Sequence, residues 1–160
     1  MNEEEVISNY NSESVLDNPF RTPDIPMFSV DWHPQDTDII LTAGGIQSEG
    51  QLLLWQLDND RIDNPIISLG DYEDAVNQAE FSPDGRWIAS IDNETLQIWQ
   101  YSTSELILTI PFIGATSIAW HPDSTRLCVG SRTGELQEFQ FTSSMELINI
   151  RNLITSDELP

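Results

Sequence analysis

The chain has 160 residues, enough for one domain of ordinary size, and its 27 acidic and 6 basic side chains give a formal net charge of −21. All six cations are arginines scattered along the chain, so the basic patch that phosphate-backbone binding requires is missing and we expect no nucleic-acid partner. The apolar runs are far shorter than the roughly 20 residues that span a bilayer, so we expect no membrane partner. An acidic N-terminus and a single cysteine predict a cytoplasmic, intracellular protein.

Residues 1–27 are rich in Glu, Asp, Asn and Ser and carry little apolar periodicity. This composition predicts an acidic N-terminal arm that is largely disordered. The arm has one hydrophobic cluster, Val15, Leu16 and Phe20. Two interpretations therefore stay open, a flexible tail and a docking strand.

The rest of the chain repeats one phrase three times. An apolar strand ends in an aromatic residue, a small or polar residue and a proline, as Trp32-His33-Pro34, Phe81-Ser82-Pro83 and Trp120-His121-Pro122. The first aromatic positions are 49 and 39 residues apart. Downstream of each anchor lies a strand centred on Trp55, Trp99 or Phe139. A period of about 40 residues with strand–turn–strand patterning indicates a repeat architecture.

The repeats divide residues 28–152 into three units, 28–70, 76–114 and 116–152, followed by a C-terminal tail, 153–160. Helical periodicity is weak throughout, which predicts an all-β protein. In the second unit, Ser82-Pro83-Asp84-Gly85 is a turn by composition, because Pro presets φ and Gly accepts a positive φ. In the first unit, Gly44–Gly50 is predicted to be a longer turn than its counterparts. The predicted strands are 28–32, 39–43, 51–57 and 66–69; 87–91, 95–101 and 106–110; and 117–120, 127–130, 135–141 and 146–150.

This pattern resembles the WD-repeat family, in which each repeat forms one four-stranded blade of a β-propeller. The resemblance implies three four-stranded antiparallel WD-like blades arranged as a partial β-propeller. The residues that define the repeats are Trp32, Pro34, Trp55, Phe81, Pro83, Asp84, Gly85, Trp99, Trp120, Pro122 and Phe139.

Some family positions are changed in this chain. The Trp-Asp pair becomes Trp55-Gln56, Trp99-Gln100 and Phe139-Gln140, and Gly70-Asp71-Tyr72 stands where a Gly-His pair would fall. The resemblance implies a hydrogen-bonded chain of His, Asp, Ser and Trp across each regular blade. We expect that chain to be incomplete here, and aromatic and aliphatic packing to hold the blades together.

No residue pattern predicts catalysis. His33 and His121 occupy equivalent positions before a proline, which favours a turn role over a catalytic or metal-binding one. Cys128 lies in an apolar strand, where a small buried hydrophobe is expected. The predictions are no catalytic, cofactor-binding or metal-binding residues, no cofactor, and no enzyme activity. A hydrolase on a propeller scaffold is the least favoured alternative.

Three blades are fewer than the about four to eight that close a propeller. The two outermost blade faces therefore lack a neighbour, and their candidate interaction residues are Leu52, Leu53, Leu54, Leu136 and Phe141. We expect a scaffold for protein–protein interaction, completed by further copies of itself or by a partner propeller fragment. Two copies would close about six blades. The charge of −21 favours a basic protein partner. A truncated piece of a longer WD-repeat protein, without independent function, is the alternative.

Overall fold

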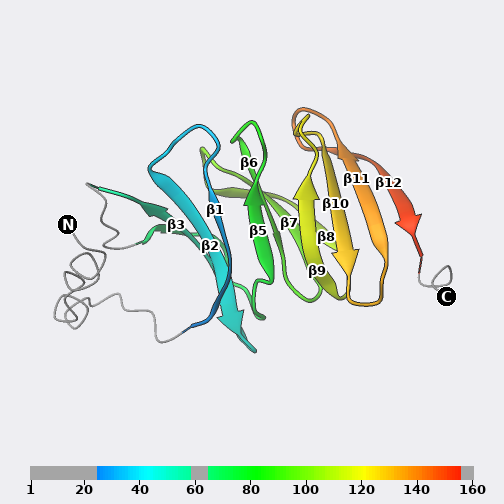
Figure 1. Ribbon diagram of the computed structural model, residues 1–160, viewed down its shortest axis with the longest axis horizontal. Coiled ribbons are helices and arrows are strands. Elements are labelled where there is room, and N and C mark those ends of the chain that lie inside the picture. The colour runs from blue at the N-terminus through cyan, green and yellow to red at the C-terminus, as the bar shows by residue number, and fades with distance from the viewer. Residues whose placement is uncertain (1–24, 59–64, 156–160) are drawn as a thin grey trace, which may run out of the picture.

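The computed structural model describes residues 25–58 and 65–155, and within these ranges every regular element is a β-strand. The strands form three four-stranded antiparallel sheets that follow one another in chain order (Figure 1), which confirms the predicted fold class. The described residues contain no helix that could cross a membrane.

Each sheet is formed by consecutive strands, with the first strand at one edge and the fourth at the other. Blade 1 contains β1 (Met27–Trp32), β2 (Ile39–Ile46), β3 (Glu49–Gln56) and β4 (Pro65–Ser68). Blade 2 contains β5 (Gln78–Phe81), β6 (Trp87–Ile91), β7 (Thr95–Gln100) and β8 (Glu105–Pro111). Blade 3 contains β9 (Ala115–Trp120), β10 (Arg126–Ser131), β11 (Leu136–Phe141) and β12 (Leu147–Ile154).

The predicted long turn at Gly44–Gly50 is wrong. The β2–β3 ladder continues through Gly45↔Gly50 and Ile46↔Glu49, leaving only Gln47 and Ser48 between the strands. Ser48 adopts a positive φ of 74°. Glycine clusters usually predict a loop. Here Gly50 instead allows β3 to lie close against the segment that follows blade 1, because a Cβ on Gly50 would lie 2.0 Å from the Asp74 carbonyl oxygen.

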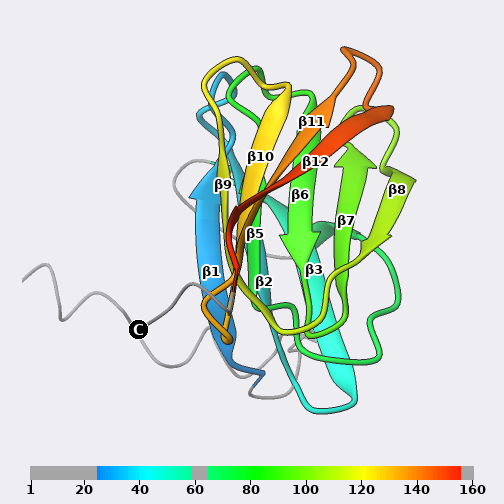
Figure 2. The ribbon, with the colours of Figure 1, turned by 90° about the vertical axis from the view of Figure 1, so that its right-hand side faces the viewer.

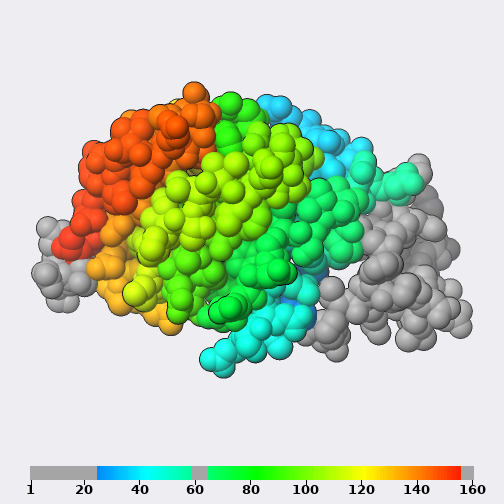
Figure 3. All heavy atoms as spheres, turned by 180° about the vertical axis from the view of Figure 1, so that it is seen from behind, coloured from blue at the N-terminus to red at the C-terminus, as the bar shows by residue number. Residues whose placement is uncertain are grey.

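The blades pack face to face through two apolar cores. The first core joins β2 and β3 of blade 1 to blade 2, with Leu41, Leu54, Ile88 and Trp99 among its buried members. The second joins blade 2 to blade 3, and Ile98 is one of its buried residues. Figure 3 shows blade 2, in green, between the other two blades. Blade 2 is thus covered on both faces, as its central strand β6 requires, because all five of its residues are buried.

Side chains of each first strand also bind the backbone of the next blade. The N–H of Ala79 in β5 donates to Ser29 Oγ (3.0 Å), and the N–H of Phe81 donates to Asp31 Oδ2 (2.8 Å). One blade later, the N–H of Ile118 in β9 donates to Gln78 Oε1 (3.0 Å). Ser29 and Gln78 are equivalent positions, so one polar contact recurs at both seams and fixes the register between neighbouring first strands.

The expected gap in the hydrogen-bonded chain of blade 2 is filled by a tyrosine. Tyr72 Oη lies 2.8 Å from Ser90 Oγ, and Trp99 Nε1 donates to Tyr72 Oη (3.1 Å) and Ser90 Oγ (3.2 Å). Asp92 caps the following turn, accepting from the N–H groups of Glu94 and Thr95. The family motif predicts a histidine near Gly70, and the Tyr72 phenol makes the hydrogen bonds to Ser90 and Trp99 instead.

Some predictions lie outside the described residues. These are residues 1–24 of the predicted arm 1–27, with the Val15, Leu16 and Phe20 cluster, and residues 156–160 of the predicted tail 153–160. Both predicted boundaries are wrong within the described residues, because β1 already begins at Met27 and β12 continues to Ile154.

We predict that Tyr72→Phe lowers the free energy of unfolding by about 1 kcal/mol at neutral pH, because it removes one partner of Ser90 and Trp99. Urea unfolding followed by tryptophan fluorescence measures this. The matched control is Tyr101→Phe, because the Tyr101 hydroxyl has no hydrogen bond within the described residues. We expect this control to change the free energy of unfolding by no more than about 0.5 kcal/mol.

Burial, opposed by the hydrogen bonds to Ser90 and Trp99, also raises the pKa of the Tyr72 phenol above its ordinary 10.0. Wild-type stability should therefore fall as the pH rises above 10, and less steeply in Tyr72→Phe. Equal losses in both variants at neutral pH would contradict the assigned role.

Candidate functional site

The two outermost faces of the arc are the candidate site. We call the face that a blade turns toward the preceding blade its leading face, and the opposite face its trailing face. The strand registers make positions of the three blades equivalent, so the free leading face of blade 1 can be compared with the covered leading faces of blades 2 and 3. The free trailing face of blade 3 can be compared in the same way with blades 1 and 2.

The leading face of blade 1 has an exposed apolar row along its first strand. Phe28, Val30 and Trp32 are 53%, 69% and 51% exposed. The residues of blade 2 that are equivalent to Val30 and Trp32 are Ala79 and Phe81, which are 1% and 5% exposed because blade 1 covers them. The row on β1 is therefore equivalent to a surface that is buried in blade 2, but no preceding blade covers it within the described residues.

The middle of this face matches the covered faces as well. Trp55 Nε1 donates to Thr42 Oγ1 (2.8 Å), as Trp99 Nε1 donates to Ser90 Oγ in blade 2. Ile40 and Leu53 beside this pair are buried. Together with the exposed row, these side chains give blade 1 a leading face like that of blade 2, whereas Phe139 and Val129 occupy the positions of this pair in blade 3.

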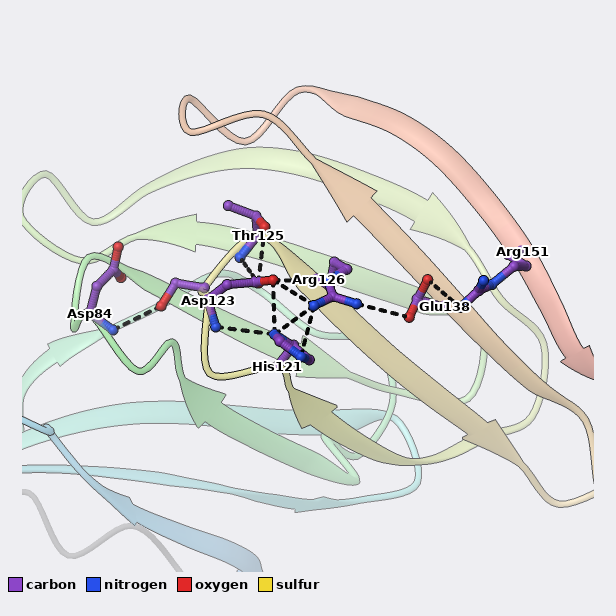
Figure 4. Close-up of polar contacts among 8 residues, drawn as sticks. Asp84, His121, Asp123, Thr125, Arg126, Glu138 and Arg151 are labelled. Atoms are coloured by element: carbon purple, nitrogen blue, oxygen red, sulfur yellow. Dashed lines mark hydrogen bonds and ion pairs between the residues drawn. The ribbon is translucent and has the colours of Figure 1, made fainter.

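The trailing face of blade 3 is charged instead. Arg151 on β12 binds Glu138 on β11 (3.0 Å), and Arg126 on β10 lies 3.9 Å from the other Glu138 oxygen. Figure 2 looks onto this end of the molecule, and Figure 4 shows the three side chains in one line across the strands. The equivalent positions of blades 1 and 2 are apolar and face the next blade. On the second, third and fourth strands in turn, these positions are Ile39, Leu54 and Ile67 in blade 1, Trp87, Ile98 and Leu108 in blade 2, and Arg126, Glu138 and Arg151 in blade 3.

The charged line continues into the β9–β10 turn. Arg126 also binds Asp123 (2.8 Å), whose second neighbour is His121. Burial opposes ionisation of Asp123, but hydrogen bonds from Thr125 and Arg126 outweigh it and lower the pKa of that carboxyl to about 2. Cys128 lies on the same face between these groups, and burial together with Glu138 raises the pKa of its thiol. The raised pKa makes Cys128 a weak nucleophile.

The predicted end-face residues are not where the sequence analysis expected them. Leu52 and Leu54 are fully buried and face blade 2, and Phe141 is 2% exposed in the core between blades 2 and 3. Leu53 does lie on the free leading face but is 5% exposed, and Leu136 is half-buried. The expectation of exposure is therefore wrong for Leu52, Leu53, Leu54 and Phe141. Only one face of each end blade is free, whereas the prediction drew residues from both.

The repeat-defining residues occupy cores and turns. Phe81, Gly85, Trp99 and Phe139 are buried, Trp55, Asp84 and Trp120 are half-buried, and Trp32, Pro34, Pro83 and Pro122 are exposed. His33 is a turn residue, as predicted: its Nδ1 accepts from the N–H of Asp36 (2.9 Å), so its Nε2 carries the proton and donates to the Gly85 carbonyl (3.0 Å). Gly85 has a φ of 71°, and a Cβ there would meet the His33 ring at 2.6 Å. This turn needs glycine for its positive φ, and also because a larger residue would clash with the His33 ring of the neighbouring blade.

An acidic pocket opens at one rim of the seam between blades 1 and 2. It measures about 500 Å³, and carboxylates dominate its lining. Its acidic members are Asp71, Glu73, Asp74, Asp92 and Glu94. In the described part of the chain, no three or more His, Cys, Asp or Glu side chains are grouped so that they could hold a metal ion.

Comparison with known proteins agrees with this architecture. The sequence profile of the WD40 family, described as "WD domain, G-beta repeat", matches residues 63–100, which include most of blade 2. The fold is similar to the crystal structure of the WD40 domain of Toxoplasma gondii coronin, with a TM-score of 0.65 and 19% identity over 78% of this chain and 33% of that one. Residues 63–100 thus match one WD repeat, and the chain as a whole is similar in fold to a WD40 domain.

Two curated relatives are also WD-repeat or tryptophan-repeat proteins by name. The periodic tryptophan protein 2 homolog of Schizosaccharomyces pombe is 26% identical over 99 residues, covering 60% of this chain and 11% of the relative. An uncharacterized WD repeat-containing protein of Deinococcus radiodurans is 39% identical over 56 residues, covering 33% of this chain and 21% of the relative. The chain thus spans a small part of the length of each relative.

The charged face can be tested through its own cysteine. We predict that Glu138→Gln lowers the pKa of the Cys128 thiol, because it removes a nearby negative charge and leaves Arg126 and Arg151 in place. Alkylation of the native protein by iodoacetamide at pH 8 should become at least about twofold faster, since the thiolate is the reactive form. Glu146→Gln, in the β11–β12 turn, is the control and should leave the rate unchanged. Equal rates in wild type and Glu138→Gln would mean that Glu138 does not act on this thiol.

Proposed function

We propose that this WD-repeat chain is a non-catalytic module for protein–protein interaction and that the leading face of blade 1 is its docking face. WD40 domains are generally scaffolds of this kind. The single observation that supports the assignment is the exposed row Phe28, Val30 and Trp32. The equivalents of Val30 and Trp32 in blades 2 and 3 are Ala79, Phe81, Ile118 and Trp120, which pack against the preceding blade. A contiguous exposed apolar patch of this kind marks an interaction site or an aggregation hazard.

The electrostatics of the described residues favour a structural role over hydrolysis. Burial and the nearby Asp31 raise the pKa of the Glu80 carboxyl. Its Oε1 accepts from Gln78 Nε2 (2.6 Å), and it also accepts from the Trp120 backbone. Glu80 therefore stabilises the seam between β5 and β9, which supports a structural role for this carboxyl over a hydrolytic one.

The charge of the module supports a basic partner. The net charge is −21, and the pocket lined by Asp71, Asp74 and Glu94 concentrates part of it at one rim. Such a surface speeds the encounter with a positively charged protein, and added salt slows it. We place this function in the cytoplasm as part of the same proposal, since Cys128 is a free thiol.

Site-specific photo-cross-linking in the source cells tests the docking face. A photoreactive phenylalanine derivative is introduced in place of Trp32 in one variant and in place of Ile113 in a control. Ile113 is 83% exposed and lies in the β8–β9 connection, away from both end faces, so it matches the apolar character without the location. We predict that position 32 yields discrete protein adducts by mass spectrometry and that position 113 yields none at comparable intensity. The same pattern from both positions would refute the proposal.

A further inference from the structure

We propose that the leading face of blade 1 takes the trailing face of a blade from another WD-type chain, and that this chain cannot supply that blade itself because its own trailing face is a charged cap. This inference rests on the proposed function, since it names the occupant of the same docking face. It makes the arc asymmetric, with one end built to receive a blade and one end closed to it.

The occupant is defined by the two seams that the chain already contains. At both seams, the centre of the trailing face is aliphatic or aromatic on three neighbouring strands, as in the set Ile39, Leu54 and Ile67. The leading faces that cover these sets carry an inner row, which is the line of apolar side chains on the first strand. They also carry a buried tryptophan or phenylalanine on the third strand. Blade 1 presents the same inner row and Trp55, so its complement is an apolar trailing face and not a polar surface.

Polar atoms of β1 add a second requirement. At both internal seams, an N–H of the later first strand donates to the preceding blade: Ala79 to Ser29, and Ile118 to Gln78. The equivalent N–H in blade 1 belongs to Val30. The Trp120 indole donates to the Glu80 carbonyl oxygen (3.4 Å), and its equivalent is the half-exposed Trp32 indole. A suitable blade therefore offers a Ser- or Gln-type acceptor and a free carbonyl along its first strand.

The trailing face of blade 3 does not meet the first requirement. At its centre, Arg126, Glu138 and Arg151 replace the apolar set, and Glu138 is paired with both arginines. Covering these ions with Val30 and Trp32 would remove them from water without new partners, and the loss of hydration opposes it. On β9, Ala119 occupies the position of Asp31 in blade 1 and Glu80 in blade 2. The carboxylate that accepts a backbone N–H of the next first strand is therefore also missing from blade 3. A head-to-tail ring of two copies is therefore disfavoured, although two copies would supply enough blades.

The cap can be removed in the full-length chain. The uncapped variant carries Arg126→Ile, Glu138→Ile and Arg151→Leu, which restores an apolar set of the kind found in blades 1 and 2. Replacing an ion-paired group by packed apolar side chains is often tolerated. We expect the uncapped variant to bind the wild-type chain with an association constant at least about a hundredfold above that of wild type for itself. Sedimentation velocity at micromolar concentration, with one chain fluorescently labelled, measures this. Val30→Asp in the wild-type partner should abolish the gain.

A control variant separates the cap from its charge. Arg86→Leu, Arg132→Ile and Glu105→Ile change the net charge equally but lie away from the trailing face of blade 3, and they should leave association at the wild-type level. If the uncapped variant does not fold, Glu138→Met with Arg151→Met is used instead, since Arg126 then keeps its partner Asp123. A folded uncapped variant that binds no better than the control would overturn the proposal, as would binding that Val30→Asp does not reduce.

Two other occupants are outcomes of the same experiment. If the uncapped variant binds only when the partner also carries Leu16→Asp and Phe20→Asp, the occupant is the chain's own N-terminal segment, and the proposal is wrong. If wild type self-associates and Val30→Asp prevents it, the occupant is a second copy, and the proposal is again wrong. Cross-linking at position 32 tests the docking face whatever covers it, so failure of this inference and failure of the proposed function give different results.

Discussion

A four-stranded blade has two faces, and each must be covered by another surface or made compatible with water. In this chain that constraint accounts for the two apolar cores that lie between the blades. Blade 2 is covered on both sides, and its strands β6 and β7 are buried along nearly their whole length. The end blades have one covered face each, and there the chain uses two different solutions. Blade 1 keeps its free face apolar, whereas blade 3 makes its free face ionic.

The seams combine a non-directional and a directional interaction. Apolar packing between the middle strands supplies most of the stabilisation but tolerates sliding. Contacts such as Ala79 N–H to Ser29 Oγ tolerate it much less, because a shift of one residue along β5 would leave a buried donor without an acceptor. The link from His33 to Gly85 acts in the same way at the turns. The arc is thus held in one register by a few polar contacts at the edge of a large apolar contact.

Much of this fold could be predicted from the sequence, because the repeat period and the strand alternation are local patterns. The anchors around Trp32, Phe81 and Trp120 placed the first strands closely. Three features escaped prediction for physical reasons. Tyr72 substitutes for histidine through geometry that a motif does not contain. The Gly44–Gly50 segment pairs because its glycines allow close backbone approach. The exposure of Leu52 or Phe141 depends on which face meets the neighbouring blade, and alternation defines two faces without saying which one is inside.

The asymmetry of the two ends has a consequence for assembly. Arcs whose two ends were both apolar would join head to tail, and such heterologous contacts give rings when the rotation closes and open filaments when it does not. The line Arg126, Glu138 and Arg151 makes one of the two end surfaces ionic at its centre, which disfavours joining through identical copies. An apolar leading face is then much less of an aggregation hazard, because its complement is missing from the molecule itself. The ionic centre of the free face of blade 3 thus disfavours the contact that the apolar face of blade 1 would otherwise make with a second copy.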